Sequence, residues 1–262
     1  TEGIRAGVFD LAGRPLAFAA QSYPTAFPRP SWAEQNPQDW WEAAGRAVRE
    51  AVRKAGIDPR DVSALCADTT NCSVVALDRD GVPVRPALIW MDVRAAEEAA
   101  LVSAEWMVPK ALWIARHERA LFDRAATICE YQDYMNLRMT GRRAASITNA
   151  AIRWHYRARE GGYARSLVGS EVVGGLMPEA AAHFGLPVGL TVAQGGSDAE
   201  VAMIGLGVTT PGKLAFITGS SHLHLGLSAE PFHGRGIWGT YADAVIPGLH
   251  LVEGGQTATG SV

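Results

Sequence analysis

Apolar and polar residues alternate at the start of the chain. Ile4, Ala6 and Val8 are separated by single residues, and residues 11–14 form a turn before a second apolar run at residues 15–21. A period of two on both sides of a turn is typical of a β-hairpin. The sequence therefore predicts a hairpin at the N-terminal end.

The next apolar residues recur at helical spacing. Asn36 followed by Pro37 supplies an N-cap and a proline at the first helical position, and the periodic stretch continues to Gly56. We expect a helix here. Trp40 and Trp41 lie within its apolar positions, so they are predicted to pack in the core.

Short apolar runs between polar turns follow this helix. They predict buried strands at residues 62–67, 74–77 and 86–90. Later spacing predicts helices at 95–107, 109–117 and 131–139, the last closed by Gly141, then a strand at 144–147 and a helix to residue 154.

Alternation returns near the end of the chain. Residues 213–218 and 222–227 predict a second hairpin, whose turn is residues 219–221, Gly-Ser-Ser. Such a small polar turn is either a phosphate-wrapping loop of backbone amides or a plain hairpin turn, and the sequence alone favours neither. The Gly-, Thr- and Pro-rich residues 207–212 predict a linker between domains.

Composition narrows the class of protein. The chain has 262 residues, of which 48% are hydrophobic and 28 are glycine, as in soluble α/β proteins with many turns. Its net charge of −3 includes no basic stripe for nucleic acid, and no apolar run is long enough to span a membrane. Three widely spaced cysteines predict a reduced, cytoplasmic protein without structural zinc. The start without methionine and the end within a Gly-rich run favour a fragment.

One loop carries the main candidate for catalysis. Residues 194–199 read Gln-Gly-Gly-Ser-Asp-Ala and precede an apolar helical stretch. Ser197 and Glu200 have the spacing of a capping box, which would leave Asp198 as a free carboxylate in the first turn. Such a carboxylate could take a proton from a substrate hydroxyl. The alternative is an ordinary acidic residue at a helix N-terminus, stabilised by the helix dipole.

Two other polar segments follow predicted strands. Residues 68–73, Asp-Thr-Thr-Asn-Cys-Ser, and residues 90–94, Trp-Met-Asp-Val-Arg, stand at strand ends, where open α/β sheets tend to bind ligands. An ordinary polar loop explains the first equally well. A local ion pair between Asp92 and Arg94 explains the second.

Other motifs fail. Residues 207–214 resemble a P-loop, but Leu214 stands where Ser or Thr should hold magnesium, and the lysine leads into a strand pattern instead of a helix. The sequence contains no nucleophile elbow, zinc-protease motif or dinucleotide fingerprint.

Taken together, several segments resemble the FGGY carbohydrate kinases, and within them the ribulokinase or pentulose-kinase branch. Residues 1–5, Thr-Glu-Gly-Ile-Arg, resemble the end of the family's first phosphate loop, with Gly3 where serine is usual and the leading Asp-x-Gly absent. The other matching segments, in the family's order, are residues 32–37, 90–94, 195–199, 217–221, 236–241 and 253–260.

The resemblance implies an α/β, actin-like (ribonuclease H-like) ATPase fold with ATP and Mg²⁺ as cofactors. Residues 1–207 would be the sugar-binding N-terminal domain, and residues 208–262 the beginning of a nucleotide-binding domain of the same fold. The expected partners are a sugar and ATP, without nucleic acid or membrane. A homodimer is compatible with the resemblance, and the oligomeric state stays open.

The resemblance also implies roles for individual residues. Asp198 would be the general base, and no residue is predicted to bind a metal directly. The residues implied to bind the sugar are Thr70, Asn71, Cys72, Asp92, Arg94, Gly196, Ser197 and Glu253. Those implied to face the phosphates of ATP are Thr1, Thr218, Gly219, Ser220 and Ser221.

The implied substrate is a ketopentose, with ribulose ahead of xylulose. Glycerol kinases of this superfamily have a charged arginine and glutamate where this chain has Thr70 and Asn71, and short neutral side chains leave room for a longer chain of hydroxyls. Kinases of xylulose, erythritol or glycerol are the alternatives. A non-catalytic sugar sensor and an actin-like chaperone also stay open.

Overall fold

The computed structural model describes residues 2–99, 103–153, 172–218 and 222–256, which divide into two compact units. Unit 1 comprises Thr1–Cys66, Cys72–Ala144 and Val172–Ala193, and unit 2 comprises Ala67–Asn71, Ala145–Glu171 and Gln194–Val262. Unit 2 gathers residues from both sides of the predicted boundary at residue 207. The division into domains at that point therefore stays a prediction.

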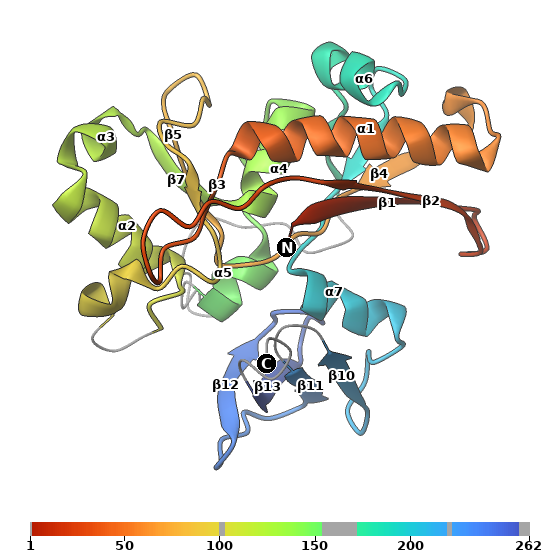
Figure 1. Ribbon diagram of the computed structural model, residues 1–262. Coiled ribbons are helices and arrows are strands. Elements are labelled where there is room, and N and C mark those ends of the chain that lie inside the picture. Colours follow the sequence, from red (N-terminus) through yellow and green to blue (C-terminus); the bar gives the residue numbers. More distant parts are fainter. Residues whose placement is uncertain (1, 100–102, 154–171, 219–221, 257–262) are drawn as a thin grey trace. The chain divides into compact units, whose positions relative to one another are not determined.

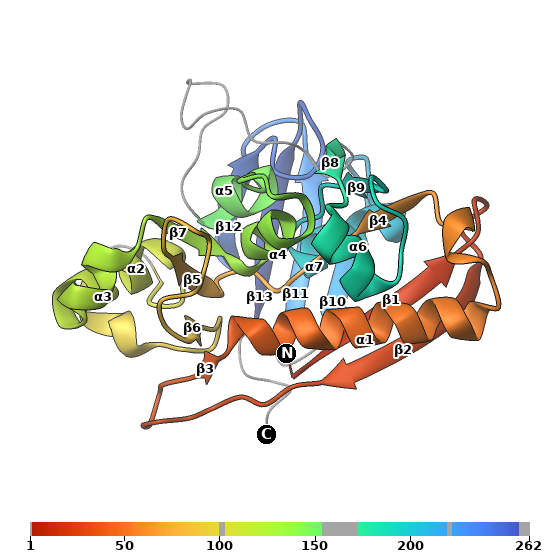
Figure 2. The same cartoon turned by 90° about the horizontal axis from the view of Figure 1, so that it is seen from above.

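A hairpin and a long helix begin unit 1. Strand β1 (Gly3–Phe9) pairs antiparallel with β2 (Pro15–Ser22), and helix α1 (Pro37–Ala55) packs along both strands (Figures 1 and 2). The Asn36 side chain accepts a hydrogen bond from Gln38 N, and Gly56 ends the helix with a left-handed φ of 67°. The predicted hairpin, cap and helix are confirmed.

The predicted packing of the two tryptophans is also confirmed. Trp40 is fully buried and Trp41 nearly so. The Trp40 ring stacks on Tyr131, with 3.7 Å between ring centroids. These contacts join α1 to the helix that begins at Tyr131.

Unit 1 contains two further small sheets. One has the antiparallel order β3-β6-β5-β7, and the other has the order β4-β9-β8, in which β4 and β9 are parallel. Their strands are β3 (Glu34–Gln35), β4 (Ala64–Cys66), β5 (Val74–Leu77), β6 (Ala87–Leu88), β7 (Thr127–Glu130), β8 (Val172–Gly175) and β9 (Thr191–Ala193). The remaining helices of the unit are η1 (Pro59–Asp61), η2 (Arg94–Glu98), α2 (Met107–His117), α3 (Arg119–Arg124), α4 (Tyr131–Thr140) and α6 (Pro178–Phe184).

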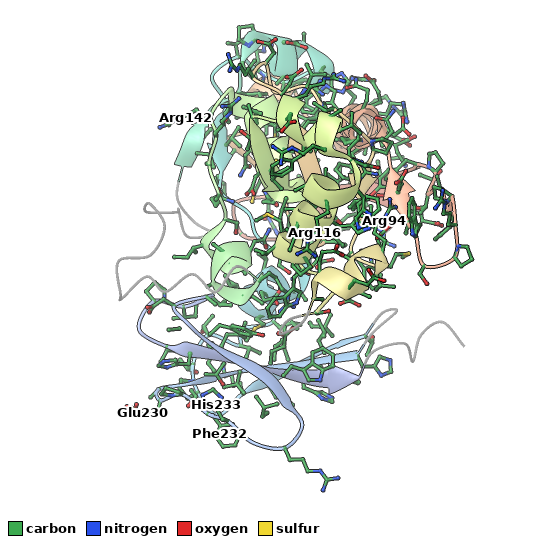
Figure 3. All side chains as sticks on the ribbon, turned by 90° about the vertical axis from the view of Figure 1, so that its left-hand side faces the viewer. Arg94, Arg116, Arg142, Glu230, Phe232 and His233 are labelled. Atoms are coloured by element: carbon green, nitrogen blue, oxygen red, sulfur yellow. The ribbon has the colours of Figure 1, made fainter. Side chains whose placement is uncertain are left out.

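Unit 2 is an antiparallel sheet with helices packed on it. The strand order is β10-β11-β13-β12. Its elements are α5 (Ile147–Arg153), α7 (Asp198–Gly205), β10 (Leu214–Thr218), β11 (His222–Ser228), β12 (Ile237–Ala242) and β13 (His250–Gln256). Ile152, Met203, Leu225 and Leu251 are fully buried and form the centre of its core. The loop between β11 and β12 carries Glu230, Phe232 and His233, which lie away from this core (Figure 3).

Four predicted elements differ from the structure. The strand predicted at residues 62–67 is only β4, whose Ala64 and Cys66 are exposed while Leu65 is half-buried, because successive side chains of a strand point to opposite faces of the sheet. The strand predicted at residues 86–90 shortens to β6. The other two concern helices.

The helix predicted at residues 95–107 is wrong. The described part of that stretch holds the short 3₁₀ helix η2, and α2 begins at Met107. Pro109 explains this start, because proline is tolerated in the first turn of a helix but not in its interior. The strand predicted at residues 144–147 is wrong too, since Ala150 N donates to Ser146 O and α5 begins at Ile147.

Two further predictions are confirmed. Helix α4 ends at Gly141 as predicted, and the predicted C-terminal hairpin is β10 and β11. No helix among the described residues is long and apolar enough to cross a membrane.

Candidate functional site

Asp198 stands in the first turn of α7, in unit 2. The loop before it is anchored to a neighbouring segment by a parallel bridge between Thr69 and Ser197. In this bridge Asp198 N donates to Thr69 O at 2.9 Å, and Thr69 N donates to Gly196 O at 3.1 Å. The backbone of the predicted base is therefore fixed on both sides.

The glycine pair makes this close approach feasible. A Cβ atom at Gly195 would lie 1.7 Å from the carbonyl oxygen of Ala67, so no other residue fits without moving the backbone. A Cβ atom at Gly196 would lie 3.2 Å from Thr148 Oγ1 and from Val201 Cγ2. Gly195 is required by the fold, whereas the sugar contact predicted for Gly196 stays a prediction.

The Asp198 side chain is solvent-accessible. Partial burial by the surrounding protein raises its pKa above the ordinary value, the Ala199 amide that donates to Oδ1 at 2.9 Å lowers it, and the charge of Asp68 raises it again. The net direction is upward, which makes Asp198 a stronger base than an ordinary surface carboxylate.

The predicted capping box is wrong. Ser197 occupies the N-cap position, but its side chain forms no cap hydrogen bond. Its Oγ instead accepts a hydrogen bond from Asn71 Nδ2 at 3.1 Å, which brings together two of the predicted sugar-binding residues. The amide of Ala199 in the first turn donates its hydrogen bond to Asp198 Oδ1 and not to the Ser197 hydroxyl. Thr70, beside Asn71, is half-buried.

Cys72 lies in unit 1 and is held by its backbone. It adopts a left-handed φ of 62°, which is rare for a residue with a Cβ atom. Its amide donates to Glu130 Oε2 at 2.9 Å. The side chain is only 4% exposed, so Cys72 shapes the loop at this point, and a sugar contact through its thiol stays a prediction.

Asp92 and Arg94 form a buried ion pair in unit 1. Arg94 Nη2 lies 2.7 Å from Asp92 Oδ2, and Arg94 Nε donates to Oδ1 at 3.0 Å. The Asp92 carboxylate also accepts from Ala33 N at 2.7 Å, and the Arg94 guanidinium lies 3.7 Å from the centroid of the Trp32 ring. The local ion pair considered for these residues is confirmed, and Arg94 lies among the side chains of the unit (Figure 3).

This pair is part of a larger set, which we call the balanced cluster: Glu34, Arg85, Asp92 and Arg94. Glu34 Oε1 lies 2.8 Å from Arg94 Nη2 and 2.7 Å from Arg85 Nη2. Two carboxylates therefore face two guanidinium groups. Arg85 Nε also lies 2.9 Å from the partly exposed Glu118.

Glu253 lies on β13 in unit 2, where it is fully buried. Arg153 binds it in a bidentate pair, with Nη1 donating to Oε2 at 3.0 Å and Nη2 to Oε1 at 2.9 Å. The Tyr241 hydroxyl donates to Oε2 at 3.0 Å. The Glu253 carboxylate is thus held by protein groups, and its predicted sugar contact stays a prediction.

Glu200 completes what we call the carboxyl cluster: Arg153, Glu200 and Glu253. Glu200 is 1% exposed, and no described residue offers either of its carboxylate oxygens a hydrogen bond of ordinary geometry. Burial and then the charge of Glu253 raise its pKa to about 7, whereas Arg153 and the nearby Ser197 hydroxyl oppose the shift.

The predicted phosphate contacts are only partly visible. Thr218 ends β10, is exposed and pairs in register with His222. Thr1, Gly219, Ser220 and Ser221 lie outside the described residues. Within the described ranges no group of three or more His, Cys, Asp or Glu side chains could hold a metal ion.

Three charged residues of the interior were missed at the level of sequence. Lys110 shares a helix face with Trp113 and Ile114, so a lone charge within an apolar stripe was the available signal. Glu200 was assigned to the capping box, although it and Asp198 are the only charged residues of the otherwise apolar helix α7. Nothing local distinguishes Arg153, whose partner is 100 residues away.

Solved structures share this fold. The xylulose kinase of Rhodospirillum rubrum matches with a TM-score of 0.87 and 27% identity, covering 100% of this chain and 60% of that one. The glycerol kinase of Plasmodium falciparum with ADP matches with a TM-score of 0.85 over 98% of this chain, and its 14% identity shows the fold alone. The class that the fold defines is therefore the actin-like sugar kinases.

Sequence comparisons narrow the class. The sequence model described as "FGGY family of carbohydrate kinases, N-terminal domain" matches residues 1–108. Over the whole chain the "FGGY carbohydrate kinase domain-containing protein" of Homo sapiens is 29% identical, and the ribulokinase of Geobacillus thermodenitrificans is 28% identical. The xylulose kinase of Klebsiella pneumoniae is 30% identical over 87% of this chain and 53% of its own length.

Residues 1–108 thus match the N-terminal domain of the FGGY carbohydrate kinases, and the chain is similar to such kinases over its whole length, as its motifs predict. It spans 58% of the human relative and 57% of the Geobacillus one. Any statement about catalytic activity is therefore a proposal about a longer protein that contains this chain.

Proposed function

We propose that the protein containing this chain is an ATP-dependent carbohydrate kinase that phosphorylates a hydroxyl group of a ketopentose, with ribulose ahead of xylulose. Similarity to the FGGY family supports the kinase class. Relatives named ribulokinase and xylulose kinase both support a pentulose substrate. The segments at residues 236–241 and 253–260, which resemble the pentulose branch, support the same substrate class.

The observation that carries this proposal is Asp198, an accessible carboxylate with a raised pKa on a backbone fixed by the Thr69–Ser197 bridge. In the proposed reaction its carboxylate takes the proton of the sugar hydroxyl. The sugar oxygen forms a bond to the γ-phosphorus, and the bond from that phosphorus to the departing ADP breaks. The products are a sugar phosphate and ADP.

ATP supplies the phosphoryl group, and magnesium neutralises its oxygens in kinases of this kind. Among the described residues only Thr218 belongs to the predicted phosphate contacts, and these residues hold no metal-ligand cluster. No step of the proposal is routed through the metal. What this chain supplies is the base and the polar groups around the sugar.

The polar residues suit a chain of hydroxyl groups. Thr70 and Asn71 are short and neutral, and Asn71 is already oriented by its hydrogen bond to Ser197. A site built to hydrogen-bond each hydroxyl rejects an analogue that lacks one far more strongly than an apolar site rejects a missing methylene. We therefore expect strong discrimination against glycerol.

Asp198→Asn in the full-length protein tests the base. The amide cannot accept the proton, so kcat should fall by about 10²–10⁴-fold while the KM for the sugar changes by only a few-fold. Asp61→Asn, at an exposed aspartate of unit 1, is the matched control and should keep normal turnover. Near-normal kcat in Asp198→Asn would mean that Asp198 is structural.

A sugar panel tests the substrate. The ratio kcat/KM should be largest for ribulose, lower for xylulose, and lowest for erythritol and glycerol. Both enantiomers of each pentulose belong in the panel. Glycerol or erythritol as the best substrate would overturn the pentulose assignment, and sugar binding without ADP release would favour a sensor.

Cytoplasmic localisation and a homodimer belong to the same proposal. Light scattering of the purified full-length protein measures its mass, and a monomer would remove the dimer from the proposal. Fractionation of the source cells tests the localisation.

A further inference from the structure

Lys110 on α2 is a buried lysine that none of the steps above uses. Its side chain is fully buried in unit 1. The ammonium Nζ donates to two backbone carbonyl oxygens, to Cys72 O at 2.8 Å and to Ile89 O at 2.7 Å. One side chain therefore joins two loops that are 17 residues apart in the chain and follow different strands.

A charged group in this place is costly. Burial lowers the pKa of Lys110 to about 8, and the neighbouring groups that oppose this shift are Cys72, Asp92, Glu130 and Glu105. A methionine would fill a similar space without the cost of burying an ammonium. Packing alone thus gives no reason for lysine here, whereas two aligned carbonyl acceptors do.

The first loop is pinned at Cys72 from both directions. Its amide donates to Glu130 Oε2, and its carbonyl accepts from Lys110. These two bonds hold the left-handed backbone of Cys72, the residue that directly follows Thr70 and Asn71 in the chain.

The second loop is the turn from Ile89 to Asp92. Ile89 O accepts from Asp92 N at 2.9 Å as well as from Lys110. Asp92 in turn binds Arg94 and the Ala33 amide. Lys110 therefore fixes the start of the turn that presents the Asp92–Arg94 pair.

We propose that Lys110 is a positioning residue for sugar recognition, whose ammonium holds the Cys72 loop and the Ile89–Asp92 turn at a fixed separation. It acts through both loops and does not touch the sugar. This role rests on the proposed kinase function. It predicts that loss of the ammonium weakens sugar binding selectively, because the loops keep their residues but lose their common anchor.

Lys110→Met in the full-length protein is the first test. We expect the KM for the preferred sugar to rise at least 10-fold and the KM for ATP to stay within about 2-fold. Lys54→Met is the matched control, because Lys54 is an exposed lysine paired with Glu50 and should leave both constants unchanged. A Lys110→Met protein with a lowered melting temperature but an unchanged sugar KM would overturn the positioning role.

The pH dependence of the unmodified protein is the second test, and it needs no variant to fold. A charged donor makes stronger hydrogen bonds than a neutral amine. The sugar KM should therefore rise several-fold as pH increases through about 8, and in Lys110→Met it should be high and flat. An inflection that persists in Lys110→Met would assign the titration to a group other than Lys110 and would overturn the proposal, as would a flat profile in the unmodified protein. If the unmodified protein phosphorylates no sugar in the same assay, the proposed function itself fails, and this role fails with it.

Discussion

The balanced cluster of unit 1 and the carboxyl cluster of unit 2 are both buried, but their charges differ. In the balanced cluster Glu34 and Asp92 face Arg85 and Arg94, with carboxylate-to-guanidinium distances of 2.7–2.8 Å. In the carboxyl cluster Glu200 and Glu253 share the single cation of Arg153. One region is neutral when every group is ionised, and the other carries one surplus negative charge.

The difference determines which region responds to pH. Arg153 Nη1 and Nη2 both donate to Glu253, and Glu200 lies beside this second buried carboxylate, so burial and the charge of Glu253 raise the pKa of Glu200 to about 7 although Arg153 opposes the shift. Two buried carboxylates that lie close together are more stable when one of them is protonated than when both are ionised. We infer that the balanced cluster acts as a fixed brace, whereas the carboxyl cluster changes its charge near neutral pH.

The largest expected effect comes from breaking the balance in unit 1. Arg94→Met leaves the buried Asp92 and the half-buried Glu34 with one cation fewer, and the free energy of unfolding should fall by about 3–5 kcal/mol. Urea denaturation measures this loss. Arg119→Met removes an exposed guanidinium that pairs with Asp123 and should change stability by less than about 1 kcal/mol. A similar small loss in both variants would contradict the balanced-cluster interpretation.

The next effect concerns the proton on Glu200. Its pKa rises from the ordinary 4.5 to about 7 in the folded protein, so folding binds a proton, and stability is lost as pH rises from about 4.5 through 7. A shift of this size corresponds to about 3 kcal/mol. Glu200→Gln has no proton to lose, so its stability relative to the unmodified protein should increase by about that amount between pH 4.5 and pH 8.

Urea denaturation at several pH values measures this difference. Glu230→Gln, at an exposed position on the loop between β11 and β12, is the control and should leave the pH dependence unchanged. A constant difference between Glu200→Gln and the unmodified protein would mean that the pKa of Glu200 is the same in the folded and the unfolded protein.

The fold could be predicted from sequence where local signals agree. Asn36-Pro37 and Gly56 bound α1 correctly because capping depends on neighbouring residues. The helix predicted at residues 95–107 is wrong because apolar residues at helical spacing do not show where the chain turns. Helix α2 begins only at Met107, so that Pro109 lies in its first turn. The missed helix α6 does have local signals, Pro178 at its start and Gly185 at its end.

The candidate site was predicted less completely, for a related reason. Asp198 and its glycines form one contiguous motif, so their proximity is fixed by the chain itself. The partners that set the electrostatics come from elsewhere: Arg153 reaches Glu253 across 100 residues, and Asn71 reaches Ser197 across 126. Only tertiary packing creates these contacts, and it redirected Ser197 and Glu200 from the predicted capping box.

The smallest expected effect tests how the surplus charge is stabilised. The Tyr241 hydroxyl donates to Glu253 Oε2, and the charge of Glu253, after burial, raises the pKa of the tyrosine. Tyr241→Phe removes this donor, so stability at pH 8 should fall by about 1–2 kcal/mol. The carboxylate that loses its donor is less stable when ionised, and the pair should therefore hold its proton to a higher pH than in the unmodified protein.

Tyr23→Phe is the matched change in unit 1, because Tyr23 hydrogen-bonds with Tyr131 and not with a carboxylate. The loss of stability in Tyr23→Phe should be similar in size but independent of pH between 5 and 8. The reason is that this change removes a hydrogen bond from a tyrosine and not from a carboxylate that titrates in this range. Stability curves of both variants across this range make the comparison. If the two curves run parallel, Tyr241 contributes a plain hydrogen bond, and the pH response of the carboxyl cluster is set by Arg153 and burial alone.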